Sequence, residues 1–434
     1  MVYQLFTTLL KWKPSRRLLQ WAKKRKLCQF LVPMLREWYE RDFIFQYPHL
    51  SLLGYGALEE LGYILQKRNV NNALIITDVI LIKTGVVEKV IKQLKKYKIK
   101  FFIFEGVKPN PSVDVVNAIV KISQQNKTDA LISIGGGSAH DAAKGASLVL
   151  SNNKSLKRFQ GLNVSKNIAV IPIIAINTTA GTGSGVTNAA VITDEQTHFK
   201  MTLTDKNIQP HIIVDDSELM MGLPVRSSMW TGIDTLVHGI EADLSIYTSF
   251  FTKTYARQCM RMVYRFLPQV FENPNNKEAR EKMAYAEFLG GIAFNSSSLG
   301  FIHSLSHAMS GAFNTPHGLA NAVLMPYVLD YELKYNRLIS KIAKLGDYMC
   351  MEVPSKDELN KAKDTIRSIV NFTKHLGIPA TLNEVQPQIT SKQIKQMANK
   401  AMKDFCGISN PVQFSKREVI HIYENAINGK FDNI

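Results

Sequence analysis

Histidines and one aspartate recur at helical spacing in two largely apolar stretches, 231–242 (TGIDTLVHGIEA) and 301–326 (FIHSLSHAMSGAFNTPHGLANAVLMP). Side chains at i and i+4 share one helix face, one turn apart, and both stretches contain such a pair. A polar residue before Pro316 predicts that a second helix begins at or just before His317. The nitrogen and oxygen donors predict a divalent-metal site. The five residues are Asp234, His238, His303, His307 and His317.

Each of these histidines, taken alone, is explained equally well as a hydrogen-bonded residue of a helix core. Four of the chain's ten histidines, however, fall in these two stretches. Their neighbours are small and apolar, so an unpaired polar group there would be costly. Three imidazoles with one carboxylate therefore favour a metal site over separate structural roles.

Composition indicates a globular protein of two domains, since 434 residues exceed one ordinary core and 45% of them are hydrophobic. Much of the net charge of +17 comes from residues 1–42, which carry ten Lys or Arg against three acids. The remaining basic residues lie along surface helices and form no stripe for nucleic acid. Four widely spaced cysteines predict free thiols and a cytoplasmic protein. No apolar run approaches the roughly 20 residues of a membrane span.

The basic N-terminal extension, 1–42, alternates Lys/Arg clusters with Leu, Trp and Phe. A secretory signal fits poorly, because the apolar stretch after Met1 is short and no A-x-A site follows. Two alternatives remain: an amphipathic arm on a membrane surface, or a helix docked on the body of the protein. Docking is favoured, because basic faces are usually solvated ones.

From about residue 47, strand and helix patterns alternate. Short apolar runs at 73–78 (ALIITD), 100–107 (KFFIFEGV) and 129–135 (DALISIG) are separated by helical patterns at 86–100 and 112–126. This β-α-β-α-β order predicts a parallel sheet covered by helices on both faces. Ligands of such sheets bind at the carboxyl ends of the strands.

A glycine turn, Gly135–Ser138, follows one of these strands and precedes a helix. Glycines let the backbone approach a diphosphate, and the helix N-terminus offers free N–H groups. The turn does not match the G-x-G-x-x-G fingerprint of dinucleotide-binding folds. Its position between a strand and a helix is therefore the main reason to favour phosphate binding over a plain turn. A second polar loop is predicted over Asn177–Glu195. Asp78, at the end of the first run, could accept hydrogen bonds from a ribose, which favours a cofactor without a 2′-phosphate.

Five motifs together resemble the iron-containing (group III) alcohol dehydrogenases, a family that includes lactaldehyde reductase and butanol dehydrogenases. They are GGGSAHDAAKG, TTAGTGSGVT, GIDTLVHGIEA, the IHSLSHAM and NTPHGLANAVLMP segments, and NPVQF. The resemblance runs from about Tyr47 to the C-terminus. It implies an α/β dinucleotide-binding domain over 43–222, an all-helical metal-binding domain over 223–434, and an active site in the cleft between them.

The resemblance also implies roles for individual residues. The metal ligands would be Asp234, His238, His303 and His317, while His307 would not bind metal and would face substrate and nicotinamide as the catalytic residue. Phe294 and Cys406 would line the substrate wall. The cofactor contacts would be Asp78, Asn110, Gly136, Gly137, Ser138 and Asp141 on the adenosine and diphosphate side, and Thr178, Thr179, Thr182, Thr187 and Lys200 toward the nicotinamide.

Three positions depart from the family pattern: Asn177 and Asp216 stand where Pro is usual, and Gly185 where Glu is usual. The change at Gly185 removes a charge beside the cofactor loop. It predicts a looser loop and weaker cofactor binding, with no metal ligand lost.

The expected function is a metal-dependent oxidoreductase that interconverts a small alcohol and an aldehyde or ketone with NAD(H); NADP is the alternative cofactor. A divalent ion held by three imidazoles and one carboxylate would act as a Lewis acid on the substrate oxygen. A proton would leave through His307 or a water chain. The family implies Fe²⁺, although ligand chemistry fits Zn²⁺ equally well. Relatives suggest a homodimer or larger assembly.

Two other functions have to be weighed. Dehydroquinate-synthase-like lyases share the two-domain plan with NAD and metal, but they need Arg and Lys side chains to hold a substrate phosphate and carboxylate. The segment from His303 to His317 contains none. A non-catalytic nucleotide-binding protein would be expected to have a broken ligand set, and all four ligands are present.

Overall fold

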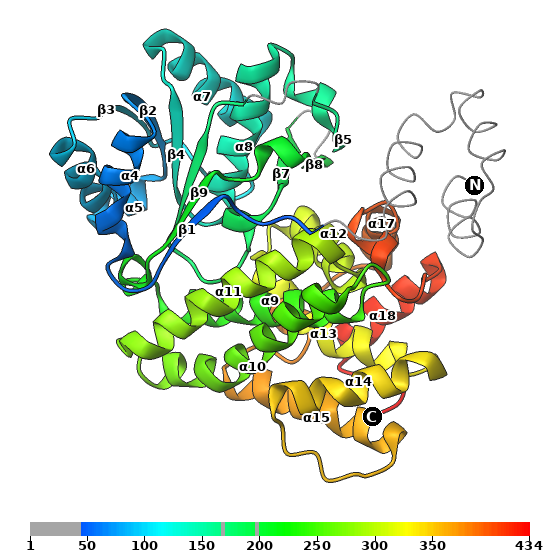
Figure 1. Cartoon of the computed structure of the whole chain (residues 1–434). Helices are drawn as coiled ribbons and strands as arrows, with labels where there is room; N and C mark the ends of the chain where they lie inside the picture. The colour runs from blue at the N-terminus through cyan, green and yellow to red at the C-terminus, as the bar shows by residue number, and fades with distance from the viewer. Residues whose placement is uncertain (1–44, 166–169, 196–198) are drawn as a thin grey trace.

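The computed structural model describes residues 45–165, 170–195 and 199–434. The N-terminal extension, 1–42, with its predicted docking or membrane-surface role, lies outside these residues. Strands occupy the described chain up to β9 (Ile212–Asp215), and the elements from α9 (Val225–Leu244) onward are helical. This confirms the predicted α/β part followed by a helical part (Figure 1). We retain the division into 43–222 and 223–434 as a proposal.

Six parallel strands form the main sheet of the described chain, in the order β1, β9, β6, β4, β2, β3. Strands β2, β4, β6 and β9 are apolar and almost wholly buried, as a parallel sheet covered on both faces requires. The edge strands β1 and β3 are more exposed. Besides β9, the bounds are Leu50–Leu53 (β1), Asn72–Ile76 (β2), Lys100–Phe104 (β3), Ala130–Gly135 (β4) and Ile173–Asn177 (β6).

Helices cover both faces of this sheet. On one face pack α4 (Leu61–Lys67) and α6 (Val86–Lys96), and on the other pack α7 (Val113–Asn126) and α8 (Gly137–Asn152). Successive side chains of β2 point to opposite faces and therefore divide between the two cores. The short α5 (Val79–Lys83) begins directly after β2. The carboxyl ends of β2, β4 and β6 thus lead into the predicted cofactor segments.

A small second sheet was not predicted. Strand β7 (Ala189–Asp194) pairs antiparallel with β8 (Phe199–Thr204), and β8 pairs parallel with β5 (Gly161–Leu162). The prediction of one polar loop over Asn177–Glu195 is therefore wrong for its last third. The sequence AAVITD buries every second residue of β7, which is the period of a half-buried strand.

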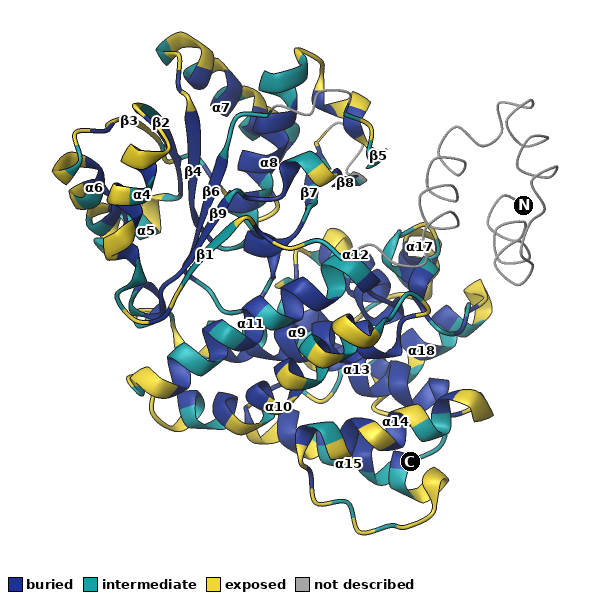
Figure 2. Ribbon diagram, in the orientation of Figure 1, coloured by how far each residue is buried: buried dark blue, intermediate teal, exposed yellow. Residues whose placement is uncertain are grey.

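The helical part has its core around α9 and α13 (His317–Glu332), which are buried almost all round (Figure 2). Helix α9 packs against α13 and against α10 and α11. No helix in the described ranges is long and apolar enough to cross a bilayer. The other helices are α10 (Phe250–Glu272), α11 (Lys277–Ser297), α12 (Phe301–Phe313), α14 (Asn336–Met349), α15 (Glu358–His375), α16 (Leu382–Val385), α17 (Ser391–Ala401) and α18 (Lys416–Asn428).

Candidate active site

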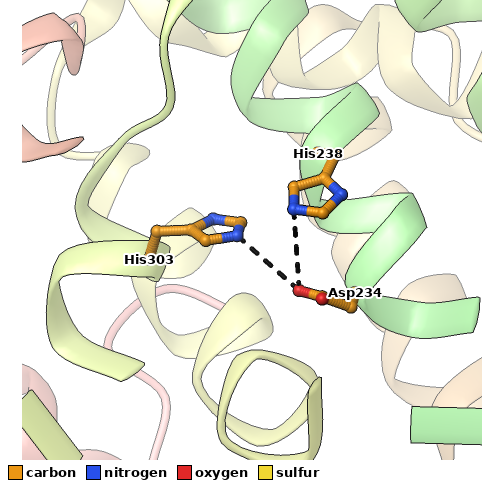
Figure 3. Close-up of side chains that lie close together, drawn as sticks. All are labelled: Asp234, His238 and His303. Carbon is orange, nitrogen blue, oxygen red and sulfur yellow. Dashed lines mark ion pairs between the residues drawn. The ribbon is translucent and has the colours of Figure 1, made fainter. Parts of the chain in front are cut away.

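The four predicted metal ligands meet at one carboxylate. Asp234 and His238 lie one turn apart on α9. His303 lies on α12, and His317 is the first residue of α13, as the sequence predicts. The Nε2 atoms of His238, His303 and His317 lie 3.8, 3.6 and 3.6 Å from Oδ1 of Asp234. Figure 3 shows His238 and His303 turned toward this carboxylate. Donors about 2.1 Å from a tetrahedral ion lie about 3.4 Å apart, so the three distances to Asp234 are close to those of a divalent-metal site. Ligand atoms of Asp234, His238 and His303 also lie within 4.8 Å of one another, and His317 joins them through its distance to Asp234.

A glycine brings the third histidine into the cluster. The first turn of α13 packs so closely on α9 that a Cβ at Gly318 would lie 2.3 Å from the carbonyl oxygen of Trp230. Any side chain there would push the helices apart. Gly318 therefore allows the neighbouring His317 to reach Asp234.

Glu241, one turn beyond His238 on α9, orients the His303 ring. One carboxylate oxygen lies 2.6 Å from Nδ1 of His303, and the other accepts the Ile302 N–H at 2.7 Å. This contact leaves Nε2 of His303 facing Asp234, which is how carboxylates commonly orient metal-binding imidazoles. Sequence reasoning missed Glu241, although it occurs within the same apolar stretch as the α9 ligands.

Asn321 bridges the donors from α13. Its Nδ2 donates to Oδ1 of Asp234 at 2.6 Å and lies 3.2 and 3.0 Å from Nε2 of His303 and His317. Its own Oδ1 is buried without a hydrogen-bond partner among the described residues. The i,i+4 spacing from His317 was the available sequence signal, but an amide in an apolar helix gave no reason to use it.

Three of the four predicted ligands, Asp234, His238 and His317, are held in the deprotonated form that a metal ion needs. Burial alone would raise the pKa of Asp234, but the nearby His238, His317 and His303 hold it well below its usual range. Burial lowers the pKa of His238 to about 3, and it lowers that of His317 well below normal although 29% of the side chain faces the cavity. His303 differs: burial is outweighed by Glu241 and Asp234, and its pKa rises to about 9. An ion would have to displace that proton.

His307 lies one turn after His303 on α12 and contacts a different carboxylate. Its Nδ1 lies 2.9 Å from Oδ2 of Asp404, and the other oxygen of Asp404 accepts the Cys406 N–H at 2.9 Å. Burial would raise the pKa of Asp404, but His307 holds it below its usual range. Burial and Asp404 raise the pKa of the Cys406 thiol well above normal, which disfavours the thiolate that a second metal site here would use. Sequence reasoning missed Asp404.

A cavity of about 330 Å³ joins the metal cluster to the predicted cofactor segments. His307 lines it, as do the four predicted ligands and both predicted substrate-wall residues, Phe294 and Cys406. The ring of Phe294 lies 4.5 Å from that of His238. From the α/β side the cavity is lined by Asn110, Gly137, Ser138, Asp141, Thr182, Thr187 and Lys200.

The remaining predicted cofactor residues lie around or below this lining. A Cβ at Gly136 would lie 2.9 Å from Oγ1 of Thr179, so the glycine turn and the threonine loop touch. Thr178 is buried beneath that contact. Asp78 lies outside the lining and caps α5, where its Oδ1 accepts the N–H groups of Ile80 and Leu81.

Two ionisable side chains on α8, Asp141 and Lys144, hold the loop after β6 and the start of β7. Asp141 accepts the Ser184 hydroxyl at 2.7 Å and the Val191 N–H at 3.0 Å. Lys144 is fully buried and donates to the carbonyl oxygens of Ser184 and Ala189 at 2.6 and 2.7 Å. Burial lowers its pKa to about 8, against the opposing effect of Asp141. Asp141, predicted to lie near the diphosphate, is thus also a loop anchor, and Lys144 was missed.

Asn177 and Gly185, two of the positions that depart from the family pattern, contact each other. A Cβ at Gly185 would lie 2.6 Å from Oδ1 of Asn177, so the asparagine fills the space of a side chain at 185. Asn177 in turn donates to Glu287 of α11 at 3.1 Å. Another helix therefore brings a carboxyl group close to the loop, although burial raises the pKa of Glu287 well above its usual value and favours its neutral form. Asp216 caps its own 3-10 turn and accepts the Gly56 and Leu58 N–H groups.

Comparisons with known proteins agree with this arrangement. Residues 48–217 match the model of the iron-containing alcohol dehydrogenases, and residues 228–427 match that of the C-terminal domain of the same family. Alcohol dehydrogenase 4 of Schizosaccharomyces pombe is 36% identical over 384 residues, 88% of this chain and 89% of its own. The NAD-dependent methanol dehydrogenase of Bacillus methanolicus is 36% identical over 380 residues, 88% of this chain and 98% of its own.

Solved structures give the same result. A crystal structure of 1,3-propanediol oxidoreductase aligns with a TM-score of 0.86 at 33% identity, over 89% of this chain and 100% of that one. An alcohol dehydrogenase from Oenococcus oeni aligns with a TM-score of 0.85 at 30% identity, over 88% of this chain and 100% of that one. Matches to both domains, in the order of the chain, show that this protein belongs to the iron-containing alcohol dehydrogenase family.

Proposed function

We propose that the cavity between the two domains is where this chain transfers hydride between a small alcohol or carbonyl compound and NAD(H). The observation that carries the proposal is the convergence of three imidazoles on the carboxylate of Asp234. The same cavity reaches the N-terminus of α8, where Gly137 and Ser138 lie. A metal site next to a phosphate-binding turn fits a nicotinamide-dependent dehydrogenase.

The metal ligands in this proposal are Asp234, His238, His303 and His317. Glu241 and Asn321 hold three of them in place before the ion binds. A divalent ion supplies a positive charge that polarises the oxygen of the substrate. We propose Fe²⁺, in line with the family, and Zn²⁺ as the alternative, because both accept three nitrogens and one oxygen.

His307 is proposed to handle the proton of the substrate hydroxyl. Asp404 accepts from Nδ1, so Nε2 is the nitrogen left for the cavity. This tautomer lets the imidazole take a proton during oxidation and return it during reduction. Asp404 acts through His307 and is a positioning residue.

NAD is proposed as the cofactor. The diphosphate would lie at Gly136–Ser138, where the first turn of α8 presents free N–H groups. Asp78, the N-cap of α5 after β2, would face the adenosine ribose and repel a 2′-phosphate, which disfavours NADP. Lys200 donates to Asn110 at 2.9 Å, and Asn110 donates to Asn314 across the cleft at 3.0 Å. These contacts would close the cleft over the cofactor. Thr178, Thr179, Thr182 and Thr187 would lie toward the nicotinamide.

The substrate is proposed to be short. The volume of about 330 Å³ has to hold the nicotinamide as well, and Phe294 and Cys406 close its wall. We further propose a cytoplasmic homo-oligomer, in which the described cysteines Cys259, Cys350 and Cys406 remain free thiols.

A dehydroquinate-synthase-like lyase is the second candidate. It would require cationic side chains to hold a phosphate and a carboxylate of the substrate. Among the described residues this cavity is lined by two lysines, Lys200 and Lys206, and by no arginine. Lys200 already donates to Asn110 and Lys206 is exposed, so neither lysine is a buried, unpaired cation for a substrate anion, and the cavity favours an uncharged substrate end.

The test is an absorbance assay at 340 nm with C2 to C4 aldehydes and alcohols, with NADH or NADPH, after loading with Fe²⁺ or Zn²⁺. We expect metal-dependent NADH oxidation by at least one short aldehyde, lost on chelation. An absence of turnover with every carbonyl compound and both metals would contradict the proposal.

A further inference from the structure

One face of α11 meets the cofactor loop, 177–188, at points spaced by one helical turn. Glu287 accepts the Gly183 N–H at 2.7 Å. Gly291 lies so close to the loop that a Cβ there would lie 2.3 Å from Cγ2 of Val186. Asn295 accepts the Asn188 N–H at 2.9 Å. The i,i+4 spacing places these three α11 residues on one stripe, so a helix of the metal-binding part holds a loop of the α/β part.

Of these three α11 residues, Glu287 is the one with a carboxyl group. Its side chain is 1% exposed, and its second oxygen accepts from Nδ2 of Asn177 at 3.1 Å. The loop has no space for a carboxylate at 185, because Asn177 fills it. Glu287 accepts its hydrogen bond from the N–H of Gly183. This glycine has a φ of +63° and turns the chain between Thr182 and Thr187. The conformation of the loop therefore depends on a residue more than a hundred positions away.

We propose that Glu287 is a positioning residue for cofactor binding, which sets the threonine-rich loop from the opposite domain. This rests on the proposed function only in taking NAD(H) as the ligand of the loop. Without the carboxyl group the Gly183 N–H would be buried without a partner, and the loop would leave its binding conformation to satisfy it. Cofactor binding would then include the cost of restoring the loop.

The experiment measures the Kd of NADH by fluorescence titration of the metal-loaded protein. Glu287→Ala is expected to raise the Kd about tenfold or more, since a hydrogen bond to a carboxyl group contributes at that level. Glu287→Gln keeps an acceptor oxygen for Gly183 but turns its NH2 group toward Nδ2 of Asn177, so the Kd is expected to rise less than in Glu287→Ala. Metal content should be the same in all three proteins, because Glu287 is not a ligand.

Glu332 of α13 provides a matched control. It is also a buried glutamate with an asparagine partner, and accepts from Nδ2 of Asn410 at 2.8 Å, but it does not contact the loop. Glu332→Ala is expected to lower the Tm while the Kd of NADH stays unchanged. A merely structural role for Glu287 would give the same pattern as this control.

An unchanged Kd in folded Glu287→Ala, or an equal loss of affinity in Glu332→Ala, would overturn the inference. If Glu287→Ala does not fold, Glu287→Asp replaces it. That variant keeps the carboxyl group but shortens its reach, so a Kd raised about threefold or more supports the inference and an unchanged Kd overturns it. Unmodified protein that does not bind NADH would instead refute the proposed function.

Discussion

Replacing Glu241 by Gln separates two opposite effects of one carboxylate on metal affinity. Glu241 orients His303 through the 2.6 Å contact with Nδ1, and together with Asp234 it raises the pKa of His303 to about 9. The first effect favours the ion, because Nε2 stays turned toward Asp234. The second opposes the ion at neutral pH, because a proton must be displaced. The variant keeps the shape of the side chain and removes its charge.

The two effects have comparable size. Loss of a carboxylate that orients a metal-binding histidine typically costs about 10- to 100-fold in affinity, or about 1.4 to 2.8 kcal/mol. A proton with a pKa of about 9 lowers apparent metal affinity about 100-fold at pH 7. Above pH 9 that competition ends, so only the loss of orientation remains. Asp234 still raises the pKa of His303 in Glu241→Gln, so only part of the proton competition is removed. We therefore expect Glu241→Gln to lose less Zn²⁺ affinity at pH 7 than at pH 9.5, where the loss should be about 10- to 100-fold.

The assay is competition for Zn²⁺ against a chromophoric chelator at both pH values. The affinity of the unmodified protein should rise between pH 7 and pH 9, and that of Glu241→Gln should rise less. Equal affinities of the two proteins at pH 9.5 would refute the orienting role of Glu241. A difference that does not change with pH would refute the link between Glu241 and the proton on His303.

Three further outcomes are expected. Asp404→Asn should lower kcat about 10- to 100-fold with unchanged metal content, because His307 loses its orienting charge; unchanged steady-state rates would argue against this role. Gly136→Val should raise the Kd of NADH at least about tenfold by clashing with Thr179, and a fluorescence titration without change would contradict the placement of the diphosphate. Burial raises the pKa of Glu332 from 4.5 to about 8, so the native carboxyl keeps a proton that the unfolded chain loses, and stability falls as pH rises between these values. In urea unfolding, Glu332→Gln should therefore match the unmodified protein near pH 4.5 and exceed it by roughly 3–5 kcal/mol at pH 8; a constant difference would be inconsistent with this titration.

The order of the elements and the ligand set could be predicted from the sequence because both have local signals. Buried parallel strands are continuous apolar runs, and the ligand pairs Asp234–His238 and His303–His307 show i,i+4 spacing. The start of α13 at His317 could be placed because Pro316 cannot continue a preceding helix.

The residues that hold the ligands had no comparable signal. Glu241, Asn321 and Asp404 acquire their roles only when α9, α13 and the segment after α17 pack against α12. A buried Glu or Asn in a helical sequence is otherwise read as a surface residue. Such contacts depend on tertiary packing, which one sequence does not reveal.

The departure at Gly185 shows the same limit more sharply. From the sequence it predicts a loosened cofactor loop, because a charge is missing. In the fold, Asn177 occupies the vacated space and Glu287 brings a carboxyl group from α11. Residues distant in the chain thus support the loop, and the packing does not indicate the expected loosening.

Metal content per chain in His303→Ala and His307→Ala, measured side by side, tests the central claim most directly. The two histidines lie one turn apart on α12 and their ring centroids are 5.9 Å apart, so they differ mainly in what they face. We expect loss of metal in His303→Ala, and full metal with slowed turnover in His307→Ala. Full occupancy in purified His303→Ala would contradict the assignment of the ligands.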